Sequence, residues 1–174
     1  AEGAQLAPGT AVDQFTIVRL LGRGGMGEVY LARDMTLGRR VALKLIALEQ
    51  LGEGNLLRAR FLYEARTTAR LAHPNIISAI DMGETGGVWW YAMELVDGES
   101  LAERLGQGAR VSEREAVKLF IPLCEALQHA FEHGVVHRDI KPGNVLVDTS
   151  RSARLVDLGL AFTEDGRMLA CTGG

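Results

Sequence analysis

The sequence is poor in cysteine and proline, which limits the classes of protein to which it can belong. It has two cysteines, Cys124 and Cys171, and four prolines among 174 residues. The two cysteines lack the paired spacing of a structural zinc site or a disulfide framework. A reducing compartment is the natural setting for such a chain, and we predict that this part of the protein lies in the cytoplasm.

The sequence also lacks an excess of positive charge and a long apolar run. Nineteen basic residues stand against 22 acidic ones, which leaves a net charge of −3. Without a basic field, nucleic acids and anionic membranes are not expected partners. No apolar run approaches the roughly 18 residues of a membrane span, and no secretory leader opens the chain, which begins at Ala1 rather than at Met. We expect no membrane contact within this segment; an anchor elsewhere in a parent protein stays open.

What the sequence does contain is enough apolar material for a core. Apolar residues make up 47% of the chain, a fraction typical of a compact domain. Residues 1–13 are small, polar or rich in glycine and proline, and they predict a flexible leader. The remainder is strand-rich at first, and then helical with short hairpins. This order predicts an α+β fold in two lobes, at about residues 14–96 and 97–174.

Local patterns predict the individual elements. Two capping residues, Ser112 and Glu115, begin a helix that is expected to run to about Glu132, with a bend at Pro122 and an end at Gly134. An earlier helix is expected over 55–72, because apolar residues recur there at helical spacing. Runs of β-branched and aliphatic residues predict strands over 15–21, 29–32, 41–46, 76–82, 88–95, 145–147 and 153–156.

A glycine cluster lies between the first two predicted strands. Glycines in such a turn let backbone amides approach phosphate oxygens without a side chain between them. A dinucleotide-binding fold is excluded, because a strand rather than a helix follows and Lys44 stands where an acidic residue is needed. A Walker A loop is excluded because no Gly-Lys-Ser/Thr follows. The cluster has the pattern G-x-G-x-x-G and consists of Gly22, Arg23, Gly24, Gly25, Met26 and Gly27.

One lysine and one glutamate stand out because each is a charge among apolar neighbours. Lys44 lies inside the third predicted strand, and Glu64 lies on the apolar stripe of the helix expected over 55–72. A lone strand lysine often extends to solvent. Buried charges need partners, however, and each of these residues supplies what the other lacks. We expect Lys44 and Glu64 to pair.

A polar octapeptide lies between two apolar runs in the second half. The sequence His-Arg-Asp-Ile-Lys-Pro-Gly-Asn occupies residues 137–144 and carries Asp139, Lys141 and Asn144. A surface turn seldom lies between such buried-looking segments. Asp157-Leu158-Gly159 follows at the end of the next predicted strand.

In order and spacing, these motifs resemble the eukaryotic-type protein kinase family in its bacterial serine/threonine (Hanks-type) branch. The resemblance covers residues 15–160. It implies a kinase-like two-lobe fold, with a complete N-lobe of an antiparallel sheet plus one helix and a partial helical C-lobe. The matching motifs are the glycine loop at 22–29, Val-Ala-Leu-Lys at 41–44, Glu64, His-Pro-Asn-Ile at 73–76, Met93-Glu94, residues 137–144 and residues 157–159.

The resemblance implies ATP and Mg²⁺ as cofactors. The glycine loop is expected to cover the phosphates, and Lys44, held by Glu64, to contact the α- and β-phosphates. Met93 resembles the gatekeeper residue, and Leu146 the floor under the adenine. The full set expected to contact ATP is Leu21, Gly22, Arg23, Gly24, Gly25, Met26, Gly27, Val29, Ala42, Lys44, Met93, Glu94, Val96, Leu146 and Asp157.

The resemblance also implies the catalytic roles. Asp139 resembles the base that accepts the proton of the substrate hydroxyl, and Lys141 the cation that steadies the γ-phosphate. Asn144 and Asp157 resemble the two Mg²⁺ ligands. Lys141, two residues after Asp139, is typical of serine/threonine rather than tyrosine kinases, so Ser and Thr hydroxyls of proteins are the expected acceptors. Autophosphorylation and dimerisation stay open.

Two departures from the family pattern concern the second half. Phe131 stands where the family usually has histidine, and the chain stops inside the expected activation segment, before roughly the last third of a kinase domain. The helix expected over 113–132 is apolar nearly all round, so we predict an exposed apolar patch on it, with poor solubility and weak cooperativity. An ATP-binding but inactive fragment or regulatory module is therefore the alternative to an active kinase. The intact Lys44, Asp139, Asn144 and Asp157 favour the kinase.

Overall fold

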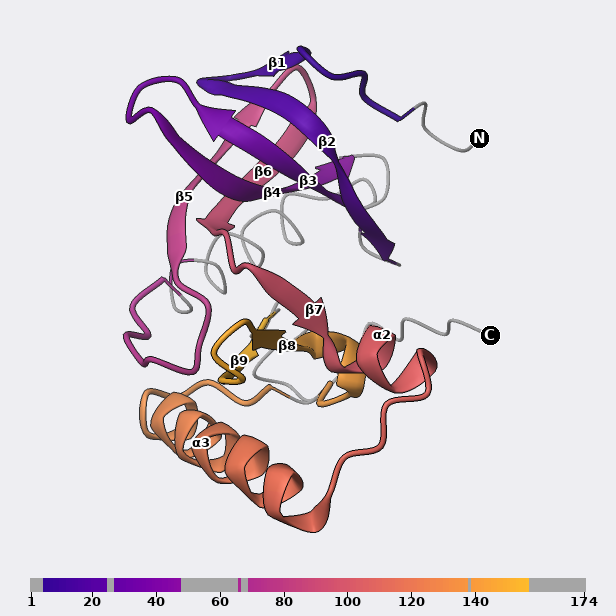
Figure 1. Ribbon diagram of the computed structural model, residues 1–174. Helices are drawn as coiled ribbons and strands as arrows, with labels where there is room; N and C mark the ends of the chain where they lie inside the picture. The colour runs from indigo at the N-terminus through magenta and orange to yellow at the C-terminus, as the bar shows by residue number, and fades with distance from the viewer. Residues whose placement is uncertain (1–4, 25–26, 48–65, 67–68, 138, 157–174) are drawn as a thin grey trace. The chain divides into compact units, whose positions relative to one another are not determined.

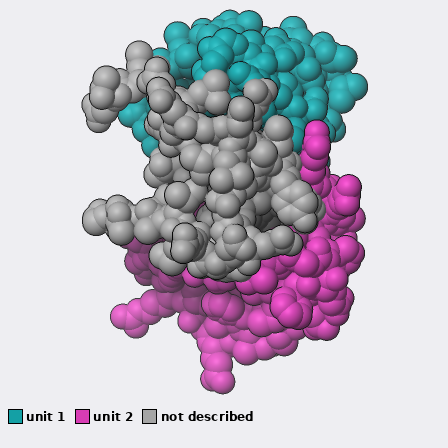
Figure 2. Space-filling model, turned by 180° about the vertical axis from the view of Figure 1, so that it is seen from behind, with its two compact units in different colours: residues 1–59, 79–95, 170–174 teal, residues 60–78, 96–169 magenta. Residues whose placement is uncertain are grey.

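The computed structural model describes residues 5–24, 27–47, 66, 69–137 and 139–156. These residues form two compact units, coloured separately in Figure 2. The first contains described residues up to 47 together with 79–95, and the second contains 66, 69–78 and 96–156.

The first unit is a single six-stranded sheet in which every pair of neighbours is antiparallel. Its strand order is β1-β2-β3-β4-β6-β5, and Figure 1 shows that the sheet is strongly twisted. The predicted hairpin around the glycine cluster is confirmed. The strands are β1 (Ala11–Val12), β2 (Phe15–Gly24), β3 (Gly27–Asp34), β4 (Arg39–Ala47), β5 (Ala79–Thr85) and β6 (Val88–Glu94).

The two faces of this sheet differ in what they carry, because successive side chains of a strand point to opposite faces. One face packs the core of the unit, where the rings of Phe15 and Trp90 meet edge to face with centroids 5.0 Å apart. This core contains Val12, Phe15, Ile17, Tyr30, Ala32, Val41, Leu43, Leu45, Trp90 and Ala92. The residues between them on β3, β4 and β6, Lys44 among them, belong to the other face.

The second unit combines a small sheet with helices. Its strands have the order β7-β8-β9 and are again antiparallel. Leu119, Leu123, Ala126 and Ala130 of α3 pack into its core with Val145, Val147, Ala153 and Leu155. The elements are β7 (Gly98–Ser100), α2 (Leu101–Gly106), α3 (Glu113–Glu132), η2 (Pro142–Asn144), β8 (Val145–Asp148) and β9 (Ala153–Leu155), all visible in Figure 1.

Helix α3 begins and ends as the sequence predicts. Ser112 caps its first turn by accepting a hydrogen bond from the amide of Glu115. At its other end Gly134 adopts a left-handed φ of 77°, and the amides of Gly134 and Val135 bond back to the carbonyls of Phe131 and Ala130. This pattern is the Schellman motif that glycine favours.

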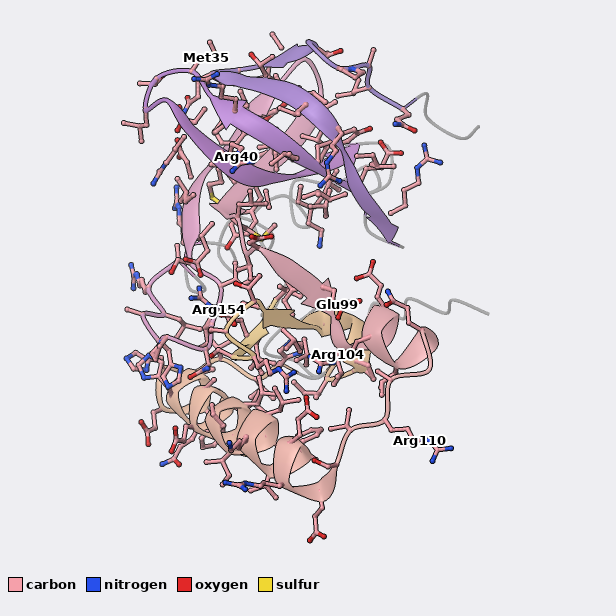
Figure 3. All side chains as sticks on the ribbon, in the orientation of Figure 1. Met35, Arg40, Glu99, Arg104, Arg110 and Arg154 are labelled. Carbon is pink, nitrogen blue, oxygen red and sulfur yellow. The ribbon has the colours of Figure 1, made fainter. Side chains whose placement is uncertain are left out.

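In a full capping box the side chain of Glu115 would also bond back to the backbone amide of Ser112, but in the structure this side chain has another partner. The carboxylate of Glu115 bonds Arg104 of α2, labelled in Figure 3, at 2.8 Å between Oε1 and Nη2. A complete capping box occurs instead at α2, where Ser100 and Glu103 bond each other's backbone amides. Arg104 thus links the two helices at the cost of the reciprocal bond at Ser112.

The exposed apolar patch predicted on α3 is present in the structure. Val117, Phe120, Ile121 and Phe131 are between 50 and 70% exposed. They follow one another at spacings of three, one and ten residues, so they lie on one side of the helix, away from the buried Leu119 and Leu123. Both sides of α3 are therefore apolar, but only one is packed.

Three regions differ from the prediction or lie largely outside the described residues. The strand expected over 76–82 begins only at Ala79, because Ile76 forms an isolated parallel bridge with Leu155 of the second unit. Residues 9–12 of the expected leader are bonded to β2. Of the helix expected over 55–72, the structure describes residues 66 and 69–72; residue 66 is helical, but residues 69–72 are not, so the predicted end at residue 72 is wrong. None of the helices described in the structure is long and apolar enough to cross a membrane.

Candidate functional site

The glycine hairpin is fixed at its base by backbone geometry. Gly24 pairs with Gly27, so the two residues between them, which lie outside the described part of the chain, connect β2 to β3. Gly27 has a φ of 125°, and a Cβ added there would lie 2.1 Å from the carbonyl oxygen of Leu45 on β4. A side chain at position 27 is therefore excluded by strain and by contact with the neighbouring strand.

Gly22 stands in a different environment. A Cβ added there would meet no other atom within 4 Å, so packing does not require glycine at this position. The strand is irregular just before it, because the register shifts between Leu20 and Gly22 and leaves Leu21 unpaired with β3. Leu21 and Arg23 are exposed on this part of β2. The open surface at Gly22 is compatible with close approach of a ligand to the backbone.

Four residues predicted to contact ATP share one face of the first sheet. Val29 lies opposite Lys44, and Ala42 lies opposite Met93. Directly opposed residues of neighbouring strands occupy the same face, as do residues two apart on one strand. Lys44 is only 5% exposed. Its expected partner Glu64 lies outside the described residues, so the predicted pairing stays a prediction.

Three further described residues that were predicted to contact ATP are Glu94 and Leu146, which lie on strands, and Val96. Glu94 ends β6, and Val96 follows it; both are half-buried. Leu146 lies on β8 of the second unit, between Ser100 of β7 and Arg154 of β9. Arg154 is labelled in Figure 3 and lies 3.9 Å from the carboxylate of Asp148.

The polar octapeptide folds into a cluster centred on Asp139. The side-chain amide of Asn144 donates to the backbone carbonyl of Asp139 at 2.9 Å and to its Oδ2 at 3.0 Å. The ammonium of Lys141 lies 2.8 Å from the same Oδ2. Asn144 is buried, whereas the side chains of Asp139 and Lys141 are 53 and 57% exposed. The loop therefore presents the carboxylate of Asp139 and the ammonium of Lys141 to solvent. The buried side-chain amide of Asn144 fixes the position of the carboxylate.

His137 connects this loop by hydrogen bonds to Val156, the residue that follows β9 and precedes residue 157. Its Nε2 is 3.1 Å from the carbonyl oxygen of Val156, and its Nδ1 accepts a bond from the amide of Asp139 at 3.3 Å. A carbonyl can only accept and an amide N–H can only donate, so the proton resides on Nε2. The amide of Val156 also donates to the carbonyl of Asn144 at 3.0 Å. Asp157 itself lies outside the described residues.

The same contacts set the charge of Asp139. The hydrogen bond from Lys141 is the main cause that lowers the pKa of Asp139 below its ordinary value of 3.8, against a smaller opposing effect of burial. The positive charge of Lys141 and the bond from Asn144 lower it further. Asp139 is therefore a carboxylate at neutral pH, which can accept a proton from a hydroxyl group.

The sequence places His137 at the start of the octapeptide but does not indicate a role for it. The feature of the sequence that could have indicated a structural role is the position of His137 at the boundary between the apolar residues 135–136 and the polar loop. Asn75, which lies in the His-Pro-Asn-Ile motif, was not assigned a role either; it is buried and donates to the carbonyl of Ala153 at 2.8 Å. Asn75 thereby fixes the start of β9, the strand that leads to residue 157.

Comparisons with known proteins identify the family and the fold of the chain. The family model described as protein kinase domain matches residues 15–169. The serine/threonine-protein kinase PknD of Mycobacterium tuberculosis is 42% identical over 165 residues, which cover 95% of this chain and 25% of that protein. The serine/threonine-protein kinase PrkC of Bacillus subtilis is 36% identical over 148 residues, which cover 85% and 23%. The chain thus spans about a quarter of the length of these relatives.

A solved structure supports the fold directly. The crystal structure of the PknI kinase domain of Mycobacterium tuberculosis superimposes with a TM-score of 0.80 at 34% identity, over 90% of this chain and 62% of that one. The predicted α+β, kinase-like fold is confirmed by this match and by the family model.

Proposed function

Because this chain belongs to the protein kinase family, with bacterial serine/threonine kinases among its relatives, we propose that the protein transfers the γ-phosphoryl group of ATP to Ser and Thr hydroxyls of other proteins. The observation that carries the proposal is the cluster of Asp139, Lys141 and Asn144. It combines a carboxylate for the acceptor hydroxyl with a cation for the transferred group. The cytoplasm, which supplies ATP, is the expected site of action.

Asp139 acts as the base toward the acceptor hydroxyl. Its bond from Asn144 orients the carboxylate, and the bond from Lys141 keeps it ionised. Among the described residues, both of these partners bond Oδ2, so we assign Oδ1 as the oxygen that orients the hydroxyl and accepts its proton. Lys141 is exposed, so it can turn its ammonium toward the charge that develops on the transferred phosphoryl group.

The first unit supplies residues for the nucleotide. The backbone of the glycine hairpin approaches the phosphates at Gly22, where no other atom would meet a Cβ. Lys44 contributes a buried positive charge for the α- and β-phosphates, and Val29, Ala42 and Met93 on the same sheet face contribute apolar contacts for the adenine. Glu94 and Val96 contribute backbone bonds to its edge, and we assign further contacts with ATP to Leu146 and Asp157.

Of the two ligands proposed for Mg²⁺, Asn144 is described in the structure, and its side-chain geometry fits that role. The amide nitrogen of Asn144 is committed to Asp139, so its carbonyl oxygen is the end that can bind a cation, and Mg²⁺ prefers oxygen ligands. We assign Asn144 and Asp157 as the ligands. When bound, Mg²⁺ neutralises charge on the phosphates.

The proposal is tested by calorimetry of ATP binding in the presence of Mg²⁺, with wild type, Lys44→Met and Lys118→Met compared. Lys118 is an exposed residue of α3 and serves as the matched control. We expect binding in the wild type and in the control, and binding weakened at least tenfold in Lys44→Met, since a buried cation is replaced by an apolar chain of similar length. Equal binding in all three would exclude the assigned role of Lys44.

The second candidate function is a module that binds ATP without transferring phosphate. The ordered cluster around Asp139 disfavours it, because a pure binding module has no need of an oriented carboxylate. It predicts ATP binding with no phosphate transfer to any protein, and transfer that depends on Asp139 would exclude it.

A further inference from the structure

The segment that precedes β2 is bonded along that strand. The amide of Gly9 donates to the carbonyl of Ile17, and the amide of Ile17 donates to that of Thr10, both at 2.8 Å. β1 then continues the same antiparallel pairing up to the turn. Residues 5–12, which we call the N-terminal strap, therefore run back along β2 from this turn in the direction of its glycine end.

Toward that end the strap contacts a network of polar side chains, which is buried at Tyr30 and exposed at Arg23. The hydroxyl of Tyr30 accepts a bond from the amide of Leu6 at 3.0 Å and donates one to the carboxylate of Glu28. Glu28 forms an ion pair with Arg23, its opposite residue on β2, at 2.8 Å. Arg23 also reaches the side-chain oxygen of Gln5, at 3.5 Å. A continuous series of contacts thus joins the strap to both strands of the glycine hairpin.

The chemistry of Tyr30 suits this linking position. The residue is completely buried, and its ring belongs to the core of the sheet. Burial, together with the bond to the Glu28 carboxylate, raises the pKa of Tyr30 above 10.0. The phenol therefore keeps its proton at neutral pH and can donate to Glu28 while it accepts from Leu6.

Two features leave the glycine end of the hairpin with little support, so a contact with the strap can restrict its motion. Gly22, Gly24 and Gly27 give this part of β2 and β3 more conformational freedom than other residues would. β1 pairs only with residues 15 and 16, so within the described residues the outer edge of β2 has no strand beside it further on. The strap and its contact with Tyr30 restrict the motion that remains.

We propose that the N-terminal strap positions the glycine hairpin for ATP, with Tyr30 as the positioning residue that connects them. The proposal rests on the ATP-binding role proposed above. Tyr30 does not contact the nucleotide itself; it orders the hairpin through its bond to Glu28, which pairs with Arg23. Loss of its hydroxyl leaves the fold intact but increases the number of conformations that the hairpin must give up when ATP binds.

The test compares wild type, Tyr30→Phe and Thr85→Val in the full-length protein. Thr85 donates to Asp13 at 3.0 Å, a bond between the N-terminal segment and the sheet that is remote from the hairpin, so it is the matched control. Two quantities are measured: backbone amide hydrogen exchange without nucleotide, and the dissociation constant of a non-hydrolysable ATP analogue with Mg²⁺. Hydrogen exchange reports on the hairpin whether or not a nucleotide binds.

For Tyr30→Phe we expect faster exchange confined to residues 20–24 and 27–30, and an analogue dissociation constant raised by about 3- to 10-fold, the size of one lost hydrogen bond. Thr85→Val should change neither quantity. Exchange that is unchanged, or faster throughout the sheet, would overturn the strap as a positioning device, and so would faster hairpin exchange with unaltered affinity. A wild type that binds no analogue would contradict the ATP-binding proposal, while exchange would still decide whether the strap orders the hairpin.

Discussion

Asn144 holds Asp139 at two points, donating through one amide nitrogen to the backbone carbonyl at 2.9 Å and to the carboxylate at 3.0 Å. The two bonds fix both the course of the loop and the direction of the carboxylate. Asn144 is buried, so water cannot easily replace these bonds. The position of Asp139 therefore depends on a residue five positions later in the chain.

The first prediction follows from this relationship. Asn144→Ala removes both bonds and the oxygen assigned to Mg²⁺, so we expect phosphate transfer to fall by roughly 100-fold or more. We also expect a loss of about 1–3 kcal/mol in the free energy of unfolding, because the carbonyl of Asp139 loses its donor. Kinetics with a peptide acceptor and urea denaturation measure the two effects.

Asn75→Ala is the matched control for this variant. Asn75 is likewise buried, and its amide nitrogen donates to the carbonyl of Ala153, but it has no contact with Asp139 among those described. It should lower stability by a similar amount but reduce kcat of the folded enzyme less than Asn144→Ala does, because Asp139 keeps both of its bonds from Asn144. If both variants lost activity equally, the effect of Asn144→Ala would reflect stability alone.

The second prediction concerns pH. Lys141 lowers the pKa of Asp139, so the carboxylate persists to a lower pH than an isolated aspartate. The stability that this pairing contributes is present above the unfolded pKa and disappears as pH falls through the lower folded value. Lys141→Met should therefore move the titration of Asp139 upward toward its ordinary value, as followed by carbon NMR of the carboxyl group. A titration that does not move, or moves downward, would show that Lys141 does not set it.

The third prediction separates two glycines of the same hairpin. In Gly27→Ala the new methyl group would lie 2.1 Å from the carbonyl oxygen of Leu45, at a φ of 125°. We expect a loss of about 2–4 kcal/mol in stability. Gly22→Ala meets no such contact, so stability should change by less than about 1 kcal/mol.

If the backbone at Gly22 approaches the phosphates, Gly22→Ala should weaken ATP binding despite this small effect on stability. Thermal denaturation and calorimetry of the two variants provide the comparison. Equal destabilisation by both substitutions would contradict the difference in their surroundings.

The fourth prediction concerns the two apolar sides of α3. Leu123 is buried in the core of its unit, and Leu123→Ala should lower stability by about 2–5 kcal/mol. Phe120, three residues earlier, is half exposed, and Phe120→Ala in this 174-residue chain should cost less than about 1 kcal/mol. Denaturation of the two variants tests this, and a larger effect of Phe120→Ala would mean that the exposed side is packed.

Much of the fold could be predicted because its signals are local. The β2–β3 hairpin follows from strand residues around a glycine turn, and the end of α3 follows from Gly134, which adopts the left-handed conformation that the Schellman motif needs. The octapeptide at residues 137–144 could be singled out because its polar residues lie between apolar runs, although the bonds of Asn144 and Lys141 to Asp139 were not predicted.

The errors came from contacts between distant residues. Ile76 has the sequence of a strand residue in the first sheet, but it pairs with Leu155 of the second unit. The expected leader was judged by its composition, which does not reveal that Leu6 bonds Tyr30, 24 residues later. The apolar circumference of α3 was visible in the sequence, but which side is buried depends on where the helix packs.

The central claim is tested most directly by phosphate transfer from γ-labelled ATP with Mg²⁺ to a general protein acceptor, followed by identification of the labelled residue. Wild type and Asp139→Ala of the full-length protein are compared. We predict labelled phosphoserine and phosphothreonine with the wild type, and a kcat lower by about 10²–10⁴ with the variant, while both bind ATP equally well. Transfer at the wild-type rate by Asp139→Ala would contradict its assignment as the base, and no transfer by a wild type that binds ATP would contradict the kinase function itself.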